Sequence, residues 1–299
     1  MSVFWNINND NNKLYSFFSS FNFEEPNFYG WFHLTYLIIF LKISIFLVSI
    51  IKKPNSLQTK LVFLVLYIPL FFIELLKQIY ATGSNFGEYK NNTWAFPMVL
   101  CSMPLYLIPI YLAIPSKHKI ISNTFLSYLS IMNLWSGCFV MFYPGDVFTK
   151  NVFISNHTMI YHGILLVLGI WTVLSQAIKY NWKNILSGYI LFIIIFILII
   201  IGNEIIYQLD INNKTDFEPN LFNMSHRYGS PLISNIPVFK KLKPWIPTLV
   251  YPFFTILGSF IIYTIFWGFS IAILKIQKQI IDKKLVKENK NSIKKLAKS

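Results

Sequence analysis

The sequence has little charge and very little cysteine. Only 13% of its 299 residues are charged, whereas 55% are hydrophobic. A soluble domain of this composition would leave more apolar surface in water than its charged side chains cover, so a soluble fold is excluded. Two cysteines are too few for a disulfide framework, and no closely spaced Cys and His cluster indicates a structural zinc site. We therefore expect neither a bound metal nor a cofactor.

Acidic residues are also scarce, at 12 against 26 Lys and Arg, which gives a net charge of +14. This charge is compatible with nucleic-acid binding, but the lysines lie between apolar segments and in the C-terminal tail. We therefore predict that they orient the chain in a membrane, and we expect no nucleic-acid partner. The sequence also lacks a Gly-x-x-x-x-Gly-Lys segment and any glycine-rich turn for binding a nucleotide.

Long apolar segments are what the sequence does contain. A bilayer core of roughly 30 Å is crossed by about 20 apolar residues in a helix. Seven segments meet or approach this length, and they predict an all-α polytopic membrane protein, a bundle of about seven transmembrane helices. The fourth is the most polar, but helices inside a bundle tolerate hydroxyl groups. The segments are Trp31–Ile51, Leu61–Tyr80, Ala95–Ile114, Ile120–Phe142, Thr158–Ile178, Ile185–Asn203 and Thr248–Leu274.

The connections between these segments alternate in charge. Lysines follow the first, third, fifth and last segments, as expected for connections on the cytoplasmic side. The pattern predicts an outer N-terminal segment (1–30), a membrane domain (31–275) and a basic cytoplasmic tail (276–299) of a multi-pass protein of the cell membrane. The tail alternates isoleucines with lysines, so we expect it to continue the last helix and to bind anionic lipids of the cytoplasmic leaflet.

Polar side chains within the apolar segments are costly and are therefore candidates for a functional site. With a rise of ~1.5 Å per residue, Cys101 lies roughly 10 Å below the outer boundary, Glu74 about 9 Å and His162 roughly 8 Å. His33 and Glu204 lie near the outer ends of their helices. We therefore predict one polar layer near the outer face, to which five helices contribute.

A thiol beside an imidazole is a usable pair of nucleophile and base, and a carboxylate such as Glu74 orients the ring. The layer therefore favours acyl transfer, with Cys101 as nucleophile and His162 as base. Each residue also has a structural alternative: Cys101 as a small packing residue, His162 bound to a neighbouring helix, and Glu74 paired with Lys77 one turn away. We place His157 at or beyond the outer surface, as a solvated loop residue.

Several short motifs, in a characteristic order, carry a family resemblance. They are Trp94–Ser102 with Pro104–Tyr106, Leu134–Gly137 with Tyr143–Asp146, Tyr161–Ile164, Asn220–Pro231 and Lys243–Trp245. In this order they resemble the YwaF-like bacterial membrane proteins, which are relatives of animal transmembrane protein 164. The likeness covers roughly Phe28 to Phe266.

The resemblance implies a multi-pass enzyme-like fold, distantly akin to the androgen-induced membrane lipid hydrolases. Animal members are thought to move acyl chains between phospholipids through a Cys and a His, which implies Cys101 as nucleophile and His162 as base here. The chain departs from the family at Val99, where bacterial members often have a His two residues before the Cys.

The sequence therefore predicts an integral membrane phospholipid acyltransferase or acyl hydrolase that acts near the outer leaflet, with membrane lipids as partners. Catalysis is assigned to Cys101, His162 and Glu74, and substrate binding to His33, Glu204 and Arg227. One alternative is a transporter or binding protein whose polar layer holds a small solute or protons. Another is a scaffold whose basic tail and long outer loop recruit partners.

Overall fold

The computed structural model describes residues 13–83, 97–144, 147–213, 220–225 and 245–296. Within these ranges the chain is helical apart from its connections, and its only β-pairing is one isolated bridge between Asn22 and Asn151. Six of the described helices are long and apolar enough to cross a membrane, and a seventh apolar helix is shorter. The predicted all-α polytopic architecture is therefore confirmed.

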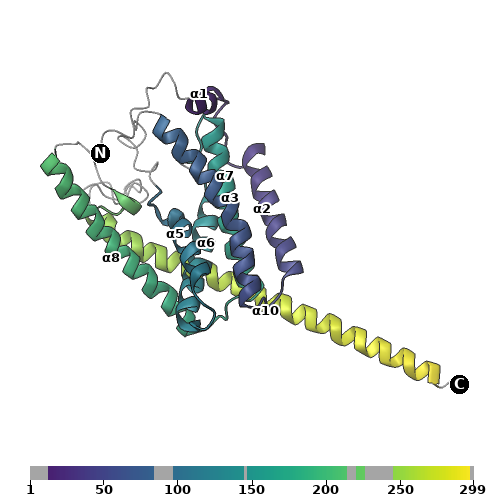
Figure 1. Cartoon of the computed structure of the whole chain (residues 1–299). Coiled ribbons are helices and arrows are strands. Elements are labelled where there is room, and N and C mark those ends of the chain that lie inside the picture. The colour runs from purple at the N-terminus through teal and green to yellow at the C-terminus, as the bar shows by residue number, and fades with distance from the viewer. Residues whose placement is uncertain (1–12, 84–96, 145–146, 214–219, 226–244, 297–299) are drawn as a thin grey trace.

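The elements follow one another along the chain as shown in Figure 1. In order they are α1 (Lys13–Ser20), α2 (Trp31–Ile50), α3 (Ser56–Gly83), the 3-10 turn η3 (Leu100–Ser102), α5 (Met103–Ala113), α6 (Lys119–Phe142), α7 (Val152–Leu174), α8 (Trp182–Asn213), the 3-10 turn η4 (Leu221–Asn223) and α10 (Trp245–Leu296).

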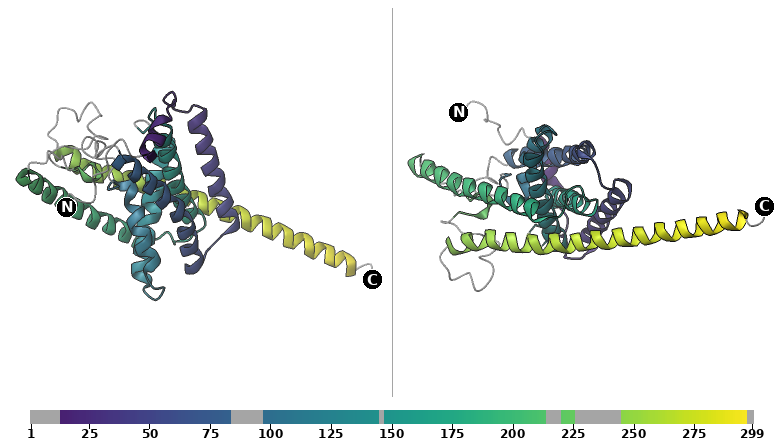
Figure 2. Two further views of the ribbon diagram at one scale, coloured as in Figure 1. Left: turned by 45° about the horizontal axis from the view of Figure 1, so that its top comes forward. Right: turned by 90° about the horizontal axis from the view of Figure 1, so that it is seen from below.

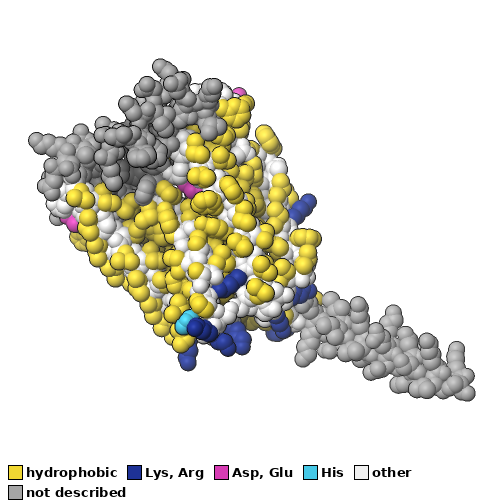
Figure 3. All heavy atoms as spheres, in the orientation of Figure 1, with side chains coloured by type: hydrophobic (Ala, Val, Ile, Leu, Met, Phe, Trp, Pro, Cys, Tyr) yellow, Lys and Arg dark blue, Asp and Glu magenta, His cyan; other side chains and the backbone are white. Residues whose placement is uncertain are grey.

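The helices α6 and α7 form the centre of the bundle. Most residues of their membrane spans are buried, whereas fewer than a third are buried in the spans of α2, α3, α8 and α10. The exposed surface is largely hydrophobic (Figure 3), as expected where a helix faces lipid instead of water. The central pair therefore carries the contacts that hold the outer helices in place.

Glycine brings the two central helices into close contact. A Cβ atom added at Gly169 of α7 would lie 2.4 Å from the Cα atom of Leu134, and one at Gly137 of α6 would lie 2.4 Å from the backbone nitrogen of Leu166. Backbones that approach this closely leave no room for a side chain, which is the usual role of small residues between membrane helices. These two positions fix the register of α6 against α7.

Three lysine-bearing connections meet at one end of the bundle. The backbone N–H of Lys53 donates to the carbonyl of Ser175 at 2.8 Å. The Lys60 ammonium group donates to the carbonyl of Leu112 at 3.0 Å, just before the third connection. Figure 3 shows lysine side chains gathered at this end. The alternation of charge thus corresponds to the two ends of the bundle, and the cytoplasmic assignment of the lysine end stays a prediction.

At two membrane segments a local feature of the chain explains why the start differs from the prediction. The third starts as η3 at Leu100, and α5 has only 11 residues, so this segment is shorter than the expected Ala95–Ile114. Val99 has an extended backbone, and a proline on either side of it, Pro97 and Pro104, lacks the N–H group that a longer helix needs. The helix α7 starts six residues before Thr158, because the Asn151 side chain accepts a hydrogen bond from the Ile154 N–H at 3.0 Å and caps the helix.

The last helix continues into the basic tail. At 52 residues, α10 is longer than one crossing requires, and its C-terminal part extends away from the bundle (Figures 1 and 2). Binding of anionic lipids by this part stays a prediction.

Candidate active site

A buried group of ionisable side chains joins α3 to α7. Glu74 is 4% exposed, and its Oε1 atom lies 2.9 Å from the Lys77 ammonium nitrogen and accepts a hydrogen bond from Gln78 at 2.6 Å. Its Oε2 atom lies 3.1 Å from Nε2 of His157. Both carboxylate oxygens therefore have partners, and the predicted pairing of Glu74 with Lys77 is confirmed.

The placement of His157 at or beyond the surface is wrong. The side chain is 6% exposed and lies in the second turn of α7, because the Asn151 cap begins that helix earlier than the hydropathy suggested. Among the described residues, the imidazole that Glu74 binds is that of His157. A charged group this far from water is stable only with such partners, so the contact fixes α7 against α3 as well as orienting the ring.

Tyr161 connects this cluster to Cys101. Its ring stacks on His157, with ring centroids 5.5 Å apart and an interplanar angle of 24°. Its hydroxyl group donates to the backbone carbonyl of Cys101 at 3.2 Å. The hydroxyl group of Ser102 lies beside both the Cys101 thiol and the Tyr161 phenol. Contacts through His157 and Tyr161 therefore lead from the Glu74 carboxylate to the backbone of Cys101.

The second histidine, His162, follows Tyr161 directly on α7 and is also buried, at 8% exposed. Its Nδ1 atom lies 2.9 Å from the carbonyl oxygen of Thr158 in its own helix, so Nδ1 carries the proton and Nε2 is left as the basic nitrogen. The predicted structural alternative was a bond to a neighbouring helix, and the observed bond is within α7. The tautomer suits a group that accepts a proton through Nε2.

The charges of Glu74 and Lys77 act on both reactive groups. Each of them interacts electrostatically with the Cys101 thiol and with the His162 ring. The ion pair of α3 therefore lies near both η3 and α7.

Of the residues predicted to bind substrate, His33 makes its hydrogen bonds outside this cluster. His33 is fully buried, its Nδ1 accepts from the Tyr29 N–H at 3.0 Å, and its Nε2 donates to the carbonyl of Met141 at 2.9 Å. The Nε2 contact thus holds α2 to the end of α6, whereas the Nδ1 contact closes the turn that leads into α2. Glu204 is half-buried on α8 and accepts from Gln208 at 2.7 Å. Arg227 lies outside the described residues.

Sequence reasoning missed His157, Tyr161 and Asn203. The Asn151 cap was the available signal for His157, since an Asn before an apolar segment is a common helix start. Tyr161 belongs to the quoted Tyr161–Ile164 motif, although only His162 was given a role. Asn203 is 3% exposed and binds a backbone 18 residues away, which no local pattern indicates.

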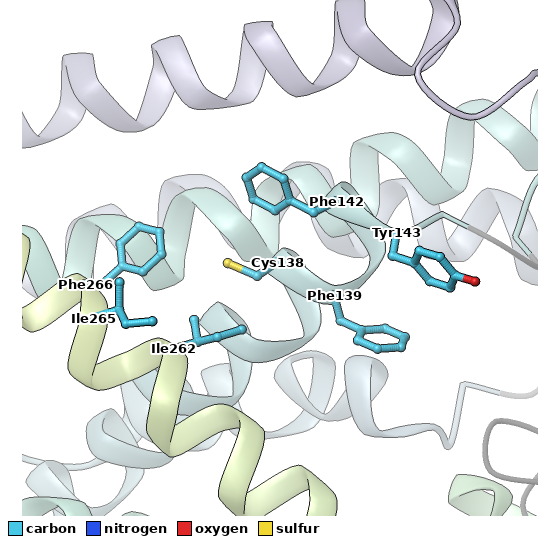
Figure 4. A pocket seen from close by; sticks show the side chains of 7 residues that line it. All are labelled: Cys138, Phe139, Phe142, Tyr143, Ile262, Ile265 and Phe266. Atoms are coloured by element: carbon cyan, nitrogen blue, oxygen red, sulfur yellow. The ribbon is translucent and has the colours of Figure 1, made fainter. Parts of the chain in front are cut away.

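The second cysteine lies in a different environment. Neither cysteine forms a disulfide, and the Cys138 thiol is buried in α6 among apolar side chains. It lines a groove between α6 and α10. The other lining side chains are aromatic rings and isoleucines: Phe139, Phe142, Tyr143, Ile262, Ile265 and Phe266 (Figure 4). In these surroundings Cys138 packs as a small apolar residue, whereas Cys101 lies next to polar and charged groups.

The chain was compared with known proteins by family and by individual match. The family model of the TMEM164 family matches residues 28–266, a range that includes all the clustered residues above. No curated protein and no solved structure matches the chain.

Proposed function

Because the chain belongs to the TMEM164 family and is a multi-pass membrane protein, we propose that it is a phospholipid acyltransferase or acyl hydrolase of the cell membrane with Cys101 as its nucleophile. The observation that carries this proposal is the hydrogen bond from Tyr161 of α7 to the backbone of Cys101 in η3. It places the residue that bears the thiol against the turn of α7 that bears the next residue, His162, whose Nε2 carries no proton. A thiol and an imidazole commonly serve as nucleophile and base in acyl transfer.

In the first step His162 takes the thiol proton at Nε2, and the Cys101 sulfur attacks the carbonyl carbon of a phospholipid ester. The tetrahedral intermediate expels the lysophospholipid oxygen, which receives the proton from His162, and the acyl chain remains on Cys101 as a thioester. In the second step a hydroxyl group of another lysophospholipid, or of water, gives its proton to His162 and attacks the thioester. The thiol then returns with the proton, so no other reactant is required.

The cluster of Glu74, Lys77 and His157 supports this chemistry as a fixed charge distribution. A buried ion pair does not need to reorganise as charge develops on the thiol or on the ester oxygen. Tyr161 and Ser102 provide hydroxyl groups beside Cys101, which suits stabilisation of that charge. The lipid reaches the thiol sideways from the bilayer, from the leaflet at this end of the bundle.

The test is turnover by purified protein in mixed micelles that contain a phospholipid with a labelled acyl chain and an unlabelled lysophospholipid. We expect labelled diacyl product, labelled fatty acid, or both, and we expect Cys101→Ser and His162→Ala to abolish both products. Two matched controls are Cys138→Ser, in the apolar groove, and His118→Ala, an exposed residue at the lysine end. Equal turnover in Cys101→Ser and Cys138→Ser would reject the proposal.

A further inference from the structure

A short segment of the long connection between α8 and α10 is packed into the bundle. Residues Asn220–Ser225 include the turn η4, and their described side chains are nearly all out of contact with solvent: Leu221 is 9% exposed, Phe222 1% and Met224 1%. A connection at the end of a membrane bundle usually lies over its surface. The burial of this 220–225 segment therefore needs a cause.

One side chain of α8 holds the segment. Asn203 donates from Nδ2 to the carbonyl of Leu221 at 3.1 Å and accepts at Oδ1 from the N–H of the same residue at 2.7 Å. The Asn203 amide thus pairs with both the N–H and the carbonyl of Leu221, as a neighbouring β-strand would. The two hydrogen bonds fix the position of Leu221 along α8. Within the segment, Asn220 accepts from the N–H of Ser225 at 2.9 Å and keeps the turn closed.

The backbone of Phe222 has an unfavourable conformation. Its φ is 59° and its ψ is 10°, a left-handed conformation that is unfavourable for a residue with a large side chain. Such a conformation persists where the surroundings over-determine it. Here the surroundings are the Asn203 amide on one side and the core that encloses the Phe222 ring on the other.

The other contact of Phe222 leads to the candidate active site. Its N–H donates to the carbonyl of Met98 at 2.7 Å, three residues before Cys101. Val99, between them, has an extended backbone and leads directly into η3. The segment therefore lies on the same short stretch of chain that positions the thiol, and it approaches this stretch from α8, whereas Tyr161 approaches it from α7.

We propose that the 220–225 segment covers the Cys101 site on its α8 side and controls access to the thiol, and that Asn203 is the positioning residue that holds it closed. Release of the two Asn203 hydrogen bonds lets Phe222 leave its left-handed conformation, so the backbone cost of the closed form favours opening. The Asn203 hydrogen bonds favour the closed form and the backbone conformation of Phe222 favours the open form. Because these two contributions oppose each other, the segment opens without unfolding of the bundle. The importance of this access for lipid turnover rests on the proposed function, whereas the cover itself does not.

The experiment measures the rate of Cys101 alkylation by N-ethylmaleimide in a Cys138→Ser background, where Cys101 is the only thiol. We expect Asn203→Leu, which keeps the branched shape and loses both hydrogen bonds, to raise this rate about ten- to a hundredfold, the effect of two hydrogen bonds of ordinary strength. Phe222→Ala retains Asn203 and removes the covering ring, so it raises the rate as well. This second variant decides the matter if Asn203→Leu does not fold.

Two controls separate an opened cover from a loosened protein. Tyr189→Phe also removes buried hydrogen bonds of α8, to Ile256 and Ser259 of α10, and we expect it to leave the Cys101 rate within about twofold. In a Cys101→Ser background, Asn203→Leu must leave the alkylation of Cys138 unchanged. The proposed cover would be rejected if Cys101 is alkylated at equal rates with and without Asn203→Leu and Phe222→Ala. It would also be rejected if Asn203→Leu raises the alkylation rate of Cys138 as much as that of Cys101.

Turnover measured in the same samples separates the two proposals. A faster Cys101 reaction in the variants together with no lipid turnover by the parent protein keeps the cover and rejects the acyl-transfer function. Lipid turnover together with unchanged alkylation keeps the function and rejects the cover.

Discussion

The two halves of α7 are built in different ways. From Leu165 to Val173 every residue is buried, and apart from the hydroxyl pair of Ser130 and Thr172 the contacts with α6 are made by backbone and apolar side chains around Gly169. From Asn151 to His162 the chain carries a capping Asn, two histidines and a tyrosine, and its contacts with α3 and η3 include hydrogen bonds made by His157 and Tyr161. One helix thus supplies a rigid support and a polar site.

The difference teaches how a reactive site is held where the solvent is lipid. Close packing along the packed half, Leu165–Val173, prevents α7 from sliding against α6, so the polar half has one fixed position. Buried polar groups need partners at defined distances, and this fixed register provides them. Volume should therefore matter most in the packed half and hydrogen bonding in the polar half, and the predictions below examine that division.

The largest effect is expected from volume in the packed half. Gly169→Leu places a side chain where a Cβ atom alone would lie 2.4 Å from the Leu134 Cα atom, so the cost exceeds the about 1–3 kcal/mol of ordinary overpacking. We expect no folded monomer in size-exclusion chromatography in detergent. Gly268→Leu is the matched control, because a Cβ at Gly268 meets no atom within 4 Å, and it should elute as the parent does. A folded Gly169→Leu protein would mean that the two helices are not in close contact.

The next largest effect is expected in the polar half. Glu74→Leu removes the carboxylate from Lys77 and His157, and breaking a buried pair from one side costs about 3–5 kcal/mol. Thermal unfolding in detergent should show a large fall in the midpoint. The double variant Glu74→Leu with Lys77→Leu should regain more than half of the loss, since no unbalanced charge remains. A double variant as unstable as the sum of its singles would contradict the ion pair.

A smaller loss is expected at the start of α7. Asn151→Ala removes the cap on the Ile154 N–H and the hydrogen bond to the Phe18 carbonyl, at a cost of about 1–2 kcal/mol. The thermal midpoint should fall accordingly. Asn151→Asp keeps the capping oxygen and should retain most of the stability. Equal losses in the two variants would show that the cap does not set the start of the helix.

The smallest effect is expected for a hydrogen bond inside the packed half. Ser130→Ala removes the contact of 2.9 Å with the Thr172 hydroxyl, which still has the carbonyls of Leu168 and Gly169 as acceptors. We expect a loss of about 0.5–1 kcal/mol, seen as a slight fall in the thermal midpoint. A loss as large as that of Glu74→Leu would contradict the division of α7 into two kinds of contact.

The sequence predicted the membrane fold well because hydropathy is summed over whole segments. Six helices coincide with predicted segments to within several residues at most ends, since a run of about 20 apolar residues has few alternatives to a helix in a membrane. The exceptions have local causes. Prolines shorten the third segment, and the Asn151 cap lengthens the start of α7. Because hydropathy is averaged over a whole segment, it does not register single prolines or a single capping residue.

The site was less predictable, because it depends on contacts between distant helices. Depth along the helices placed Glu74, Cys101 and His162 in one layer, but it could not show that Glu74 binds His157. An error of six residues at the start of α7 had moved His157 into the solvent. The Asn203 contact and the left-handed Phe222 depend on the packed core, and no residue pattern in the sequence specifies them.

The central claim is that Cys101 carries the acyl chain between donor and acceptor, and the mass of the intact protein tests it most directly. Purified protein is mixed with a phospholipid of one defined acyl chain, without a lysophospholipid acceptor, and quenched in acid. We predict an added mass of one acyl group that maps to Cys101, is released by hydroxylamine and is absent from Cys101→Ser. An acyl group on another residue, or lipid turnover that continues in Cys101→Ser, would contradict the account.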